Sequence, residues 1–305
     1  MPTLSACRVR VPCSTSNLGS GFDTLGLALD LHLRVEYHAD EGPLRLERRG
    51  TLEDLDVPSV DDLLSSTFRR VVEAGGANAE GTLRVDSDIP VGRGLGSSAA
   101  ALVAGYAVAR CALGAKPDQA GAFAWATARE GHGDNAGPCA LGGFHAVVPG
   151  PEGPRTLSLP LSQEIGFAYA APSARVSTAE ARGALPSMVT HGAAVAGLGR
   201  LTALIEGIAR ADAHLIRAGV EDELHVPYRL PLIPRGREAM EAGYDAGAWG
   251  VTVSGSGSGL IALCPREEGA AVAAAMRAVF DGAEDEDEAL SFSLRPDLDG
   301  VTREG

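Results

Sequence analysis

Lysine is almost absent from this chain of 305 residues, which contains only Lys116, in a connector between two helical patterns. Two common nucleotide-binding sites depend on a lysine. A Walker A loop needs one directly after its last glycine, where this chain has Ser97. A protein-kinase site needs one on a strand of the Val-Ala-Ile-Lys type. Both kinds of site are therefore excluded.

Cysteine is also scarce, and the spacing of the cysteines does not suit metal or disulfide chemistry. The five cysteines are odd in number and scattered, and no two form a Cys-x-x-Cys pair. This argues against both a structural zinc site and a disulfide framework. Several lie in apolar runs and are expected to be buried as small hydrophobic residues. They are Cys7, Cys13, Cys111, Cys139 and Cys264.

Long apolar runs and an excess of positive charge are missing as well. The N-terminus lacks the apolar core of a signal peptide, and no apolar run reaches the ~18 residues of a membrane-spanning helix. The net charge is −14, from 40 acidic and 26 basic residues, which opposes binding to nucleic acid. We therefore expect a soluble cytoplasmic enzyme with no nucleic-acid or membrane partner.

The length predicts two domains, each with its own core. A Pro-Gly-Pro-Glu-Gly-Pro run around Pro151 places the boundary near residues 150–160, giving domains of 1–155 and 156–305. Both halves mix strand and helix patterns, which indicates an α+β fold with two layers per domain.

Residue periodicity predicts the elements of both halves. In the first half, strands are expected over 7–12, 29–37, 44–47, 83–85 and 141–149, helices over 62–74, 98–113 and 117–130, and a loop over 13–22. In the second half, strands are expected over 167–171, 250–254 and 259–264, helices over 190–219, 235–246 and 267–280, and a solvated acidic loop over 284–288.

The most informative segment is the glycine loop, residues 90–100, which leads into the alanine-rich helix. Glycine allows close backbone approach and positive φ, and the helix directs unpaired N–H groups and its positive dipole end into the loop. That arrangement binds phosphate. A dinucleotide fingerprint fails because its sixth position is Ser97. The alternative is a serine-capped turn before a core helix. The loop residues are Pro90, Val91, Gly92, Arg93, Gly94, Leu95, Gly96, Ser97, Ser98, Ala99 and Ala100.

Two other segments carry carboxylates that are suited to binding a cationic ligand. Asn17 and Asp23 lie on a glycine-rich loop, where a carboxylate suits an ammonium group; an Asx turn is the alternative. Glu130 ends a helix near the phosphate loop, which suits Mg²⁺ bound by a carboxylate, phosphate oxygens and water. Asp134 and Asn135 follow it, where turn chemistry alone is the alternative.

Two arginines in the second half, Arg182 and Arg229, would bind a substrate carboxylate if they converged on a pocket. The planar guanidinium group of an arginine matches the geometry of a carboxylate and can form two parallel hydrogen bonds to it. If the two arginines do not converge, they are surface residues. The second glycine-serine loop, Ser254-Gly255-Ser256-Gly257-Ser258-Gly259, is either a hairpin turn or a flap over that pocket.

Taken in order, these segments resemble the GHMP kinase superfamily and, within it, the homoserine kinases. The glycine loop is similar to the family's Pro-x-Gly-x-Gly-Leu-Gly-Ser-Ser-Ala motif, and residues 17–23 and 254–259 are similar to its first and third motifs. The resemblance implies a two-domain GHMP kinase fold. Its N-terminal domain is like ribosomal protein S5 domain 2, its C-terminal domain is a ferredoxin-like α/β sandwich, and the active site lies between them. It also implies ATP, Mg²⁺, L-homoserine as substrate and a homodimer.

The resemblance also implies residue roles. Ser98 and Glu130 would hold Mg²⁺, and the backbone of 92–98 would wrap the phosphates. Asp23 would bind the substrate ammonium group, with Arg182 and Arg229 on its carboxylate. The expected catalytic set is Asn135, Glu130 and Ser98, and the expected substrate-binding set is Asn17, Asp23, Asp134, Asn135, Arg182, Arg229 and Gly257. An amide cannot take a proton, so Asn135 is excluded as a general base.

Some positions depart from the family pattern: Ser20 and Gly133 stand where proline is frequent, and Ser258-Gly259 replaces Pro-Thr. These changes leave open a sister kinase for threonine or mevalonate, or a non-catalytic regulator with the same fold. The set of Asp23, Arg182 and Arg229 favours an amino acid over mevalonate. The presence of Glu130, Ser97 and Ser98 argues against a silent regulator.

Overall fold

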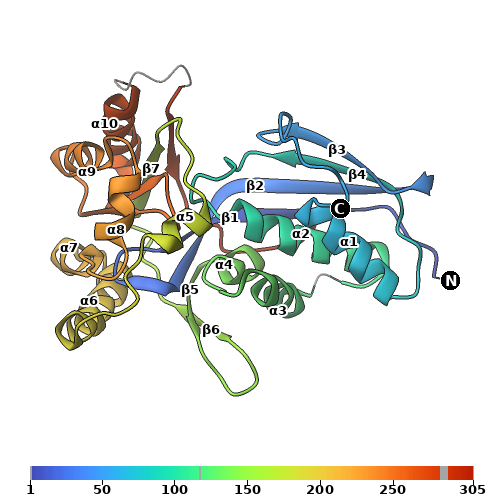
Figure 1. Cartoon of the computed structure of the whole chain (residues 1–305), viewed down its shortest axis with the longest axis horizontal. Helices are drawn as coiled ribbons and strands as arrows, with labels where there is room; N and C mark the ends of the chain where they lie inside the picture. The colour runs from blue at the N-terminus through green and yellow to red at the C-terminus, as the bar shows by residue number, and fades with distance from the viewer. Residues whose placement is uncertain (1, 117, 282–287, 305) are drawn as a thin grey trace.

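The structure, a computed structural model, describes residues 2–116, 118–281 and 288–304. Figure 1 shows two lobes side by side along the long axis. The first lobe carries the N-terminal strands and the helices α1 to α4, and the second lobe carries α6 to α10.

A seven-stranded sheet forms the first lobe, in the order β11-β1-β2-β4-β3, with β5 paired to β2 and β6 paired to β5. The 23-residue strand β2 pairs with β4 near its end and with β5 near its start, so it serves two parts of the sheet. Its strands are β1 (Cys7–Asn17), β2 (Gly21–Pro43), β3 (Arg45–Gly50), β4 (Glu80–Ser87), β5 (Phe144–Val148), β6 (Arg155–Leu159) and β11 (Thr302–Glu304).

Four helices pack in this lobe: α1 (Leu63–Ala74), α2 (Ser97–Ala112), α3 (Gln119–Glu130) and α4 (Ala136–Leu141). The alanine-rich α2 contacts both α1 and α3 as well as β1. Eleven of its sixteen residues are buried. Its small side chains permit this close packing, which fixes the N-terminal end of α2 at the inner edge of the lobe.

The second lobe is a four-stranded antiparallel sheet, ordered β10-β7-β9-β8, with helices packed on it. Every residue of β7 is buried, as expected for a strand covered on both faces. Its strands are β7 (Ile165–Ala171), β8 (Gly250–Val253), β9 (Leu260–Pro265) and β10 (Leu290–Leu294). Its helices are α5 (Thr178–Gly183), α6 (His191–Arg210), α7 (Ala213–Val220), α8 (Val226–Arg229), α9 (Gly236–Asp245) and α10 (Gly269–Asp281).

The structure differs in places from the elements expected from the sequence. Residues 13–17 belong to β1 rather than to a loop, because partners across the molecule satisfy the hydroxyls of Ser14 and Thr15. The helical region expected over 190–219 consists of two helices, because Ala211 takes a left-handed conformation and Asp212 caps α7. The acidic run 284–288 lies outside the described residues except for Glu288.

Periodicity also missed several short elements, namely α4, α5, α8, β6, β10 and β11. Leu141, expected to begin a strand, ends α4, and β5 starts at Phe144. Such elements are too short to show a period of their own, so tertiary contacts decide their conformation.

The division at residue 155 stays a proposal, which the sheet topology refines. The strands β6 and β11 both pair within the first sheet, and Pro296 bridges to Leu29. We therefore propose that the first domain extends to residue 159 and also takes the final residues from about 295 onward.

The helix α6 is the one helix of the described residues that is long and apolar enough to cross a membrane by length and composition, which the sequence expectation missed. It packs against α7 through Leu204, Gly207 and Ile208. Because a core helix can pass the same test, this is weak evidence for a membrane span.

Candidate active site

A cavity of about 400 Å³ lies where the two lobes meet. Its walls come from the glycine loop and the end of β1, from the link between α3 and α4, from α5, and from the second glycine-serine loop. It brings together most of the predicted site residues: Asn17, Asp23, Val91, Gly92, Gly94, Gly96, Ser97, Ser98, Glu130, Asp134, Asn135, Arg182 and Arg229.

The glycine loop keeps its shape because two glycines touch other segments too closely for any side chain. Gly94 has a φ of +79°, and a Cβ there would lie 2.0 Å from the carbonyl oxygen of Ser254. Gly96 has a φ of +65°, and a Cβ there would lie 2.2 Å from Ser14 Oγ. Only glycine meets both requirements. The three sequence motifs are therefore joined at the loop.

The last four residues of the glycine loop, from Ser97 onward, form the first turn of α2. Gly96 is its N-cap residue, and no side chain of the described residues caps it. The N–H groups of the first turn thus remain available to a ligand in the cavity. With the positive dipole end of a 16-residue helix behind them, they are suited to an anionic group.

Glu130 and Ser98 lie together at the edge of the cavity. Ser98 Oγ donates a hydrogen bond to Glu130 Oε1, while Glu130 Oε2 is buried without a hydrogen-bond partner among the described residues. Burial raises the pKa of Glu130 from its ordinary 4.5, and the bond from Ser98 opposes the rise. A cation would satisfy the unpartnered oxygen and favour the charged carboxylate, so this pair fits Mg²⁺.

No cluster of three or more His, Cys, Asp or Glu side chains suited to a metal occurs in the described part of the chain. A cation at Glu130 would thus have few protein ligands. This composition matches the preference of Mg²⁺ for one or two protein ligands completed by phosphate oxygens and water.

The turn between β1 and β2 places Asp23 on the cavity wall. Asn17 Oδ1 accepts a hydrogen bond from the Asp23 amide at 2.9 Å, and both residues have positive φ. The Asp23 carboxylate receives two bonds from Arg182, at 2.9 and 3.1 Å. Both side chains are more than one-third exposed, so this pair contributes little to stability and can separate for a ligand.

Arg229 enters the same cavity from α8 and is only 2% exposed. Its Nη1 donates to the carbonyl oxygen of Gly255 at 3.0 Å, but its Nε is buried without a partner among the described residues. Burial, followed by the charge of Arg182, lowers the pKa of Arg229 from its ordinary 12.5. A buried cation with an unused donor suits an anionic group of a ligand.

The residues after α3 form a hydrogen-bonded floor. His132 Nδ1 bonds Asp134 Oδ1 at 2.7 Å, which raises the pKa of His132. Burial alone would raise the pKa of Asp134, but the bond and charge of His132 outweigh it and lower that pKa. Asn135 Oδ1 accepts from Ser14 Oγ at 3.0 Å, and its Nδ2 donates to Ser16 Oγ at 2.9 Å.

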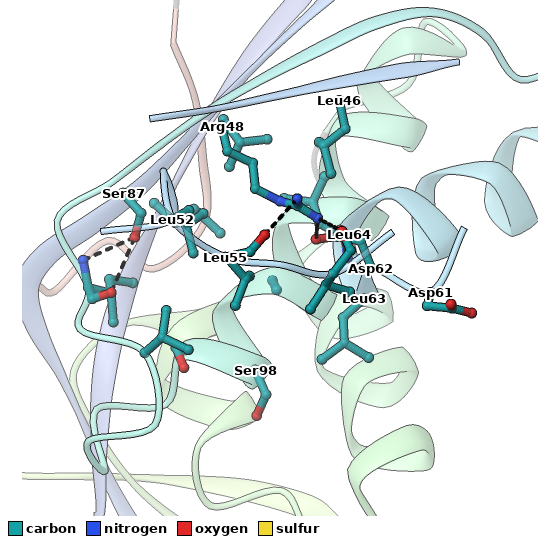
Figure 2. Close-up of a pocket in the computed structure, with 17 residues that line it drawn as sticks. Leu46, Arg48, Leu52, Leu55, Asp61, Asp62, Leu63, Leu64, Ser87 and Ser98 are labelled. Atoms are coloured by element: carbon teal, nitrogen blue, oxygen red, sulfur yellow. Dashed lines mark hydrogen bonds and ion pairs between the residues drawn. The ribbon is translucent and has the colours of Figure 1, made fainter. Parts of the chain in front are cut away.

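A second, apolar cavity of about 280 Å³ adjoins the first, and both are lined by Val91, Ser97 and Ser98. Figure 2 shows Arg48 at one side of it, with bonds to the Leu55 carbonyl oxygen at 3.1 Å and to Asp62 Oδ2 at 2.9 Å. These bonds secure its rim. Its apolar wall includes Leu33, Leu46, Leu52, Leu55, Leu63, Leu64, Val85 and Ile89. A flat apolar group would fit it, directly beside the phosphate loop.

The chain matches two family models, the GHMP kinases N terminal domain over residues 62–143 and GHMP kinases C terminal over residues 204–282. A homoserine kinase of Prochlorococcus marinus (strain MIT 9303) is 38% identical over 273 residues, covering 88% of this chain and 86% of that protein. One from Thermus thermophilus is also 38% identical, covering 89% of this chain and 91% of that protein. The chain belongs to the homoserine kinase family.

A solved homoserine kinase, from Cytophaga hutchinsonii, has the same fold as this family member. Its TM-score is 0.86 at 28% identity, over 98% of this chain and 97% of that one. The two-domain GHMP kinase fold predicted from the motifs is thereby confirmed.

Some predicted residues of this homoserine kinase family member do not line the cavity. Leu95, Ala99 and Ala100 are fully buried in the core. Pro90 and Gly257 are also buried. The side chain of Arg93 turns away, and its Nη1 donates to the carbonyl oxygens of Pro172 and Ala174. These residues support the loops rather than contact a ligand through their side chains.

Sequence reasoning gave no role to several residues that line the cavity: Ser16, His132, Val176, Ser177, Thr178 and Ser256. It also missed the apolar cavity completely. The motif around Ser177 was visible, since Ser177 caps α5 as a serine commonly does. The apolar cavity had no such signal, because its walls come from four separate segments of the chain.

Proposed function

We propose that this chain is a cytoplasmic kinase that transfers the γ-phosphoryl group of ATP to the hydroxyl of L-homoserine, forming O-phospho-L-homoserine for threonine biosynthesis. One observation carries the proposal. A single cavity joins an uncapped helix N-terminus to Asp23, Arg182 and Arg229, a set of charges that complements a zwitterionic amino acid. The homoserine kinases to which the chain is similar support the same assignment.

ATP would occupy both cavities. The apolar cavity accepts the base beside Val91, and the triphosphate follows the backbone of residues 92–98 to the start of α2. Backbone N–H groups and the helix dipole then replace the lysine that this chain lacks at the loop.

Mg²⁺ would be held by Ser98 and Glu130. When bound, it neutralises charge on the β- and γ-phosphate oxygens. The buried, unpartnered Oε2 of Glu130 supports this role.

The amino acid would lie beyond the γ-phosphate, with its ammonium group at Asp23 and its carboxylate at Arg182 and Arg229. In the structure Asp23 and Arg182 bind each other. The two charges of the substrate would replace that contact, so neither side chain loses its counter-charge. A substrate with only one of the two charges would leave one member of the pair unmatched.

Phosphoryl transfer itself needs positioning more than proton abstraction. The homoserine oxygen forms a bond to the γ-phosphorus as the bond to the β,γ-bridging oxygen breaks, and ADP leaves. In a loose transition state the hydroxyl gives up its proton late, to an oxygen of the transferred phosphoryl group or to water, so no base from the protein is required. Asn17 and Asn135 would orient the hydroxyl, and Asn135 is itself held by Ser14 and Ser16.

The test is a coupled assay of ADP release with homoserine, threonine, serine and mevalonate. We expect the highest kcat/KM with homoserine. If another acceptor gave the highest kcat/KM, that acceptor and not homoserine would be the substrate. Absence of turnover with all four would favour a non-catalytic ligand-binding role. If Asp134→Asn abolished turnover while both substrates still bound normally, a carboxylate base would have to be restored to the mechanism.

We also propose a homodimer, and the start of α6 with the segment before it supplies the surface that supports it. Residues 183–199 contain no charged side chain, in a chain of net charge −14. Met188, Val189, Val195 and Leu198 are 84%, 51%, 68% and 68% exposed. A copy of this chain can cover such a surface without bringing like charges together, whereas an anionic membrane would repel the chain.

Light scattering after size exclusion tests the dimer. The wild type should elute as a dimer and the Val195→Glu/Leu198→Glu variant as a monomer. The matched control is Val60→Glu/Leu298→Glu, at residues that are 64% and 65% exposed on other surfaces. A monomeric wild type, or equal behaviour of the two variants, would contradict the proposal.

A further inference from the structure

His225 is a fully buried histidine that touches the turn carrying Asp23. Its Nε2 lies 2.9 Å from the carbonyl oxygen of Gly19, and its ring stacks on Phe22 with centroids 5.0 Å apart at 21°. Gly19 and Phe22 belong to the first lobe, whereas His225 belongs to the second. One imidazole ring therefore holds the β1–β2 turn from two sides.

The same residue begins the helix that carries Arg229. Asp222 Oδ2 accepts hydrogen bonds from the amides of His225 and Val226, both at 2.7 Å. The carbonyl oxygen of His225 accepts the amide of Arg229 at 3.0 Å, which closes the turn of α8. The Arg229 guanidinium in turn lies 5.0 Å from the centre of the Phe22 ring. The position of His225 thus determines where both the β1–β2 turn and the Arg229 side chain lie.

The ring acts as a neutral donor. Its Nδ1 is buried without a hydrogen-bond partner in the described residues, so the proton belongs on Nε2, facing the Gly19 carbonyl oxygen. Burial lowers the pKa of His225 from its ordinary 6.5. The charged groups that act on it are Asp222, Arg229 and Asp23, of which only the two carboxylates favour the protonated form.

We propose that His225 is a positioning residue that locks the β1–β2 turn to α8, and so fixes the spacing between the ammonium-binding Asp23 and the carboxylate-binding Arg229. This inference rests on the proposed function, because it assumes that these two side chains bind the ends of one amino acid. The spacing between two charged groups decides which α-amino acids fit, so His225 contributes to substrate selection without touching the substrate.

A purely structural role would give a different result. Loss of a structural residue lowers stability and leaves substrate binding by the folded protein unchanged. Loss of a positioning residue at this turn raises the KM for homoserine while the KM for ATP stays constant. Among the described residues, the hydrogen bonds and ring contact of His225 lead to Gly19, Phe22 and Asp222 rather than to the glycine loop, and His225 does not line the apolar cavity. The ratio of the two KM changes therefore separates the two roles.

The chain offers a matched control in His145, on β5. It is also a buried histidine, its Nε2 bonds a backbone carbonyl oxygen, that of Gly142, at 2.6 Å, and its Nδ1 is also without a partner among the described residues. It does not line either cavity. His145→Leu removes the same kind of hydrogen bond at a place where no substrate is expected.

The experiment measures the KM for homoserine, the KM for ATP, kcat and Tm for the full-length protein. We expect His225→Leu to raise the KM for homoserine about 10- to 100-fold, since small misplacements at a binding site cost up to that amount. The KM for ATP should stay within about 2-fold. His145→Leu should change Tm only. His225→Gln, which keeps a donor of similar reach, should restore most of the homoserine affinity.

An unchanged KM for homoserine in His225→Leu, or an equal rise for homoserine and ATP, would overturn the inference. If His225→Leu fails to fold, His225→Gln and His225→Asn decide instead: the longer amide reaches Gly19 and the shorter one does not, so equal KM values would also overturn it. A wild-type protein without activity on homoserine would overturn the proposed function as well, and is thereby distinguished from failure at His225 alone.

Discussion

Replacing Arg229 by methionine tests the amino-acid site most directly. The substitution keeps an unbranched side chain of similar length and removes the charge and all five N–H donors. The carbonyl oxygen of Gly255 is not left unpaired, because Asn17 Nδ2 also donates to it at 2.7 Å. Burial of the guanidinium is unfavourable, as its lowered pKa shows. The variant should therefore fold with a Tm close to that of the wild type.

The magnitude follows from the lost contact with the substrate carboxylate. A hydrogen bond to a charged group contributes about 1.5–3 kcal/mol, and each 1.4 kcal/mol corresponds to a factor of ten. The KM for homoserine should rise about 10- to 150-fold. The KM for ATP should not change, because Arg229 donates its hydrogen bond to Gly255 rather than to the glycine loop and does not line the apolar cavity.

The assay is ADP release at saturating ATP, with Arg237→Met, at an exposed arginine of α9, as the control. A second acceptor, which lacks the carboxylate, shows whether the effect depends on that group. 3-Aminopropanol is homoserine without the carboxylate, so it should be a poor substrate whose KM Arg229→Met leaves unchanged. If Arg229→Met did not raise the KM for homoserine, or raised it equally for 3-aminopropanol, Arg229 would not be the carboxylate ligand.

Three further predictions concern other parts of the molecule. Gly94→Ala should raise the KM for ATP at least about 10-fold and lower Tm, since its Cβ would meet Ser254, whereas Gly76→Ala, with a similar φ and open space around it, should leave the KM for ATP unchanged. Glu130→Gln should lower kcat about 100-fold and raise the Mg²⁺ concentration needed for half-maximal activity; an unchanged Mg²⁺ titration would remove Glu130 from the metal site. Burial lowers the pKa of His145 from 6.5, so the unfolded state binds protons more readily than the folded state. The free energy of unfolding therefore falls as the pH drops below 6.5. In urea titrations at pH 5.5 and 7.5, the difference in the free energy of unfolding between the two pH values should be smaller for His145→Gln than for the wild type.

The sequence pointed to individual side chains that the structure places around the cavity, but not to the contacts that shape the cavity walls. Gly94 and Asp23 stood out because loop composition and charge are local properties that a motif preserves. The residue pairs that shape the cavity, such as Ser14 with Asn135 and Thr15 with Ser254, are far apart in the chain and carried no local signal. The polar run 13–17 was therefore assigned to a loop, although partners from both lobes make it a buried strand.

The apolar cavity illustrates the same limit. Its leucines come from β2, β3, the following loop and α1, and each alone is an ordinary core residue. What makes them a pocket is that α2 begins with small side chains at this point, and that depends on how the helix docks on the sheet. The short helix α8 was missed for a related reason: four residues show no periodicity, and the cap from Asp222 decides the turn.

The path of the chain between the lobes has a consequence for engineering. The chain leaves the first sheet after Leu159 and comes back to it beyond Leu294, and the neighbouring strands β7 and β10 lie side by side, with Leu294 opposite Phe167. The second lobe is thus an insert with adjacent entry and exit points. Truncation at residue 159 would discard β11 together with the second lobe and leave β1 as a bare edge. Excision of residues 160–294 alone would keep β11 but expose the hydrophobic core that the first lobe shares with second-lobe residues such as Phe167 and Leu263.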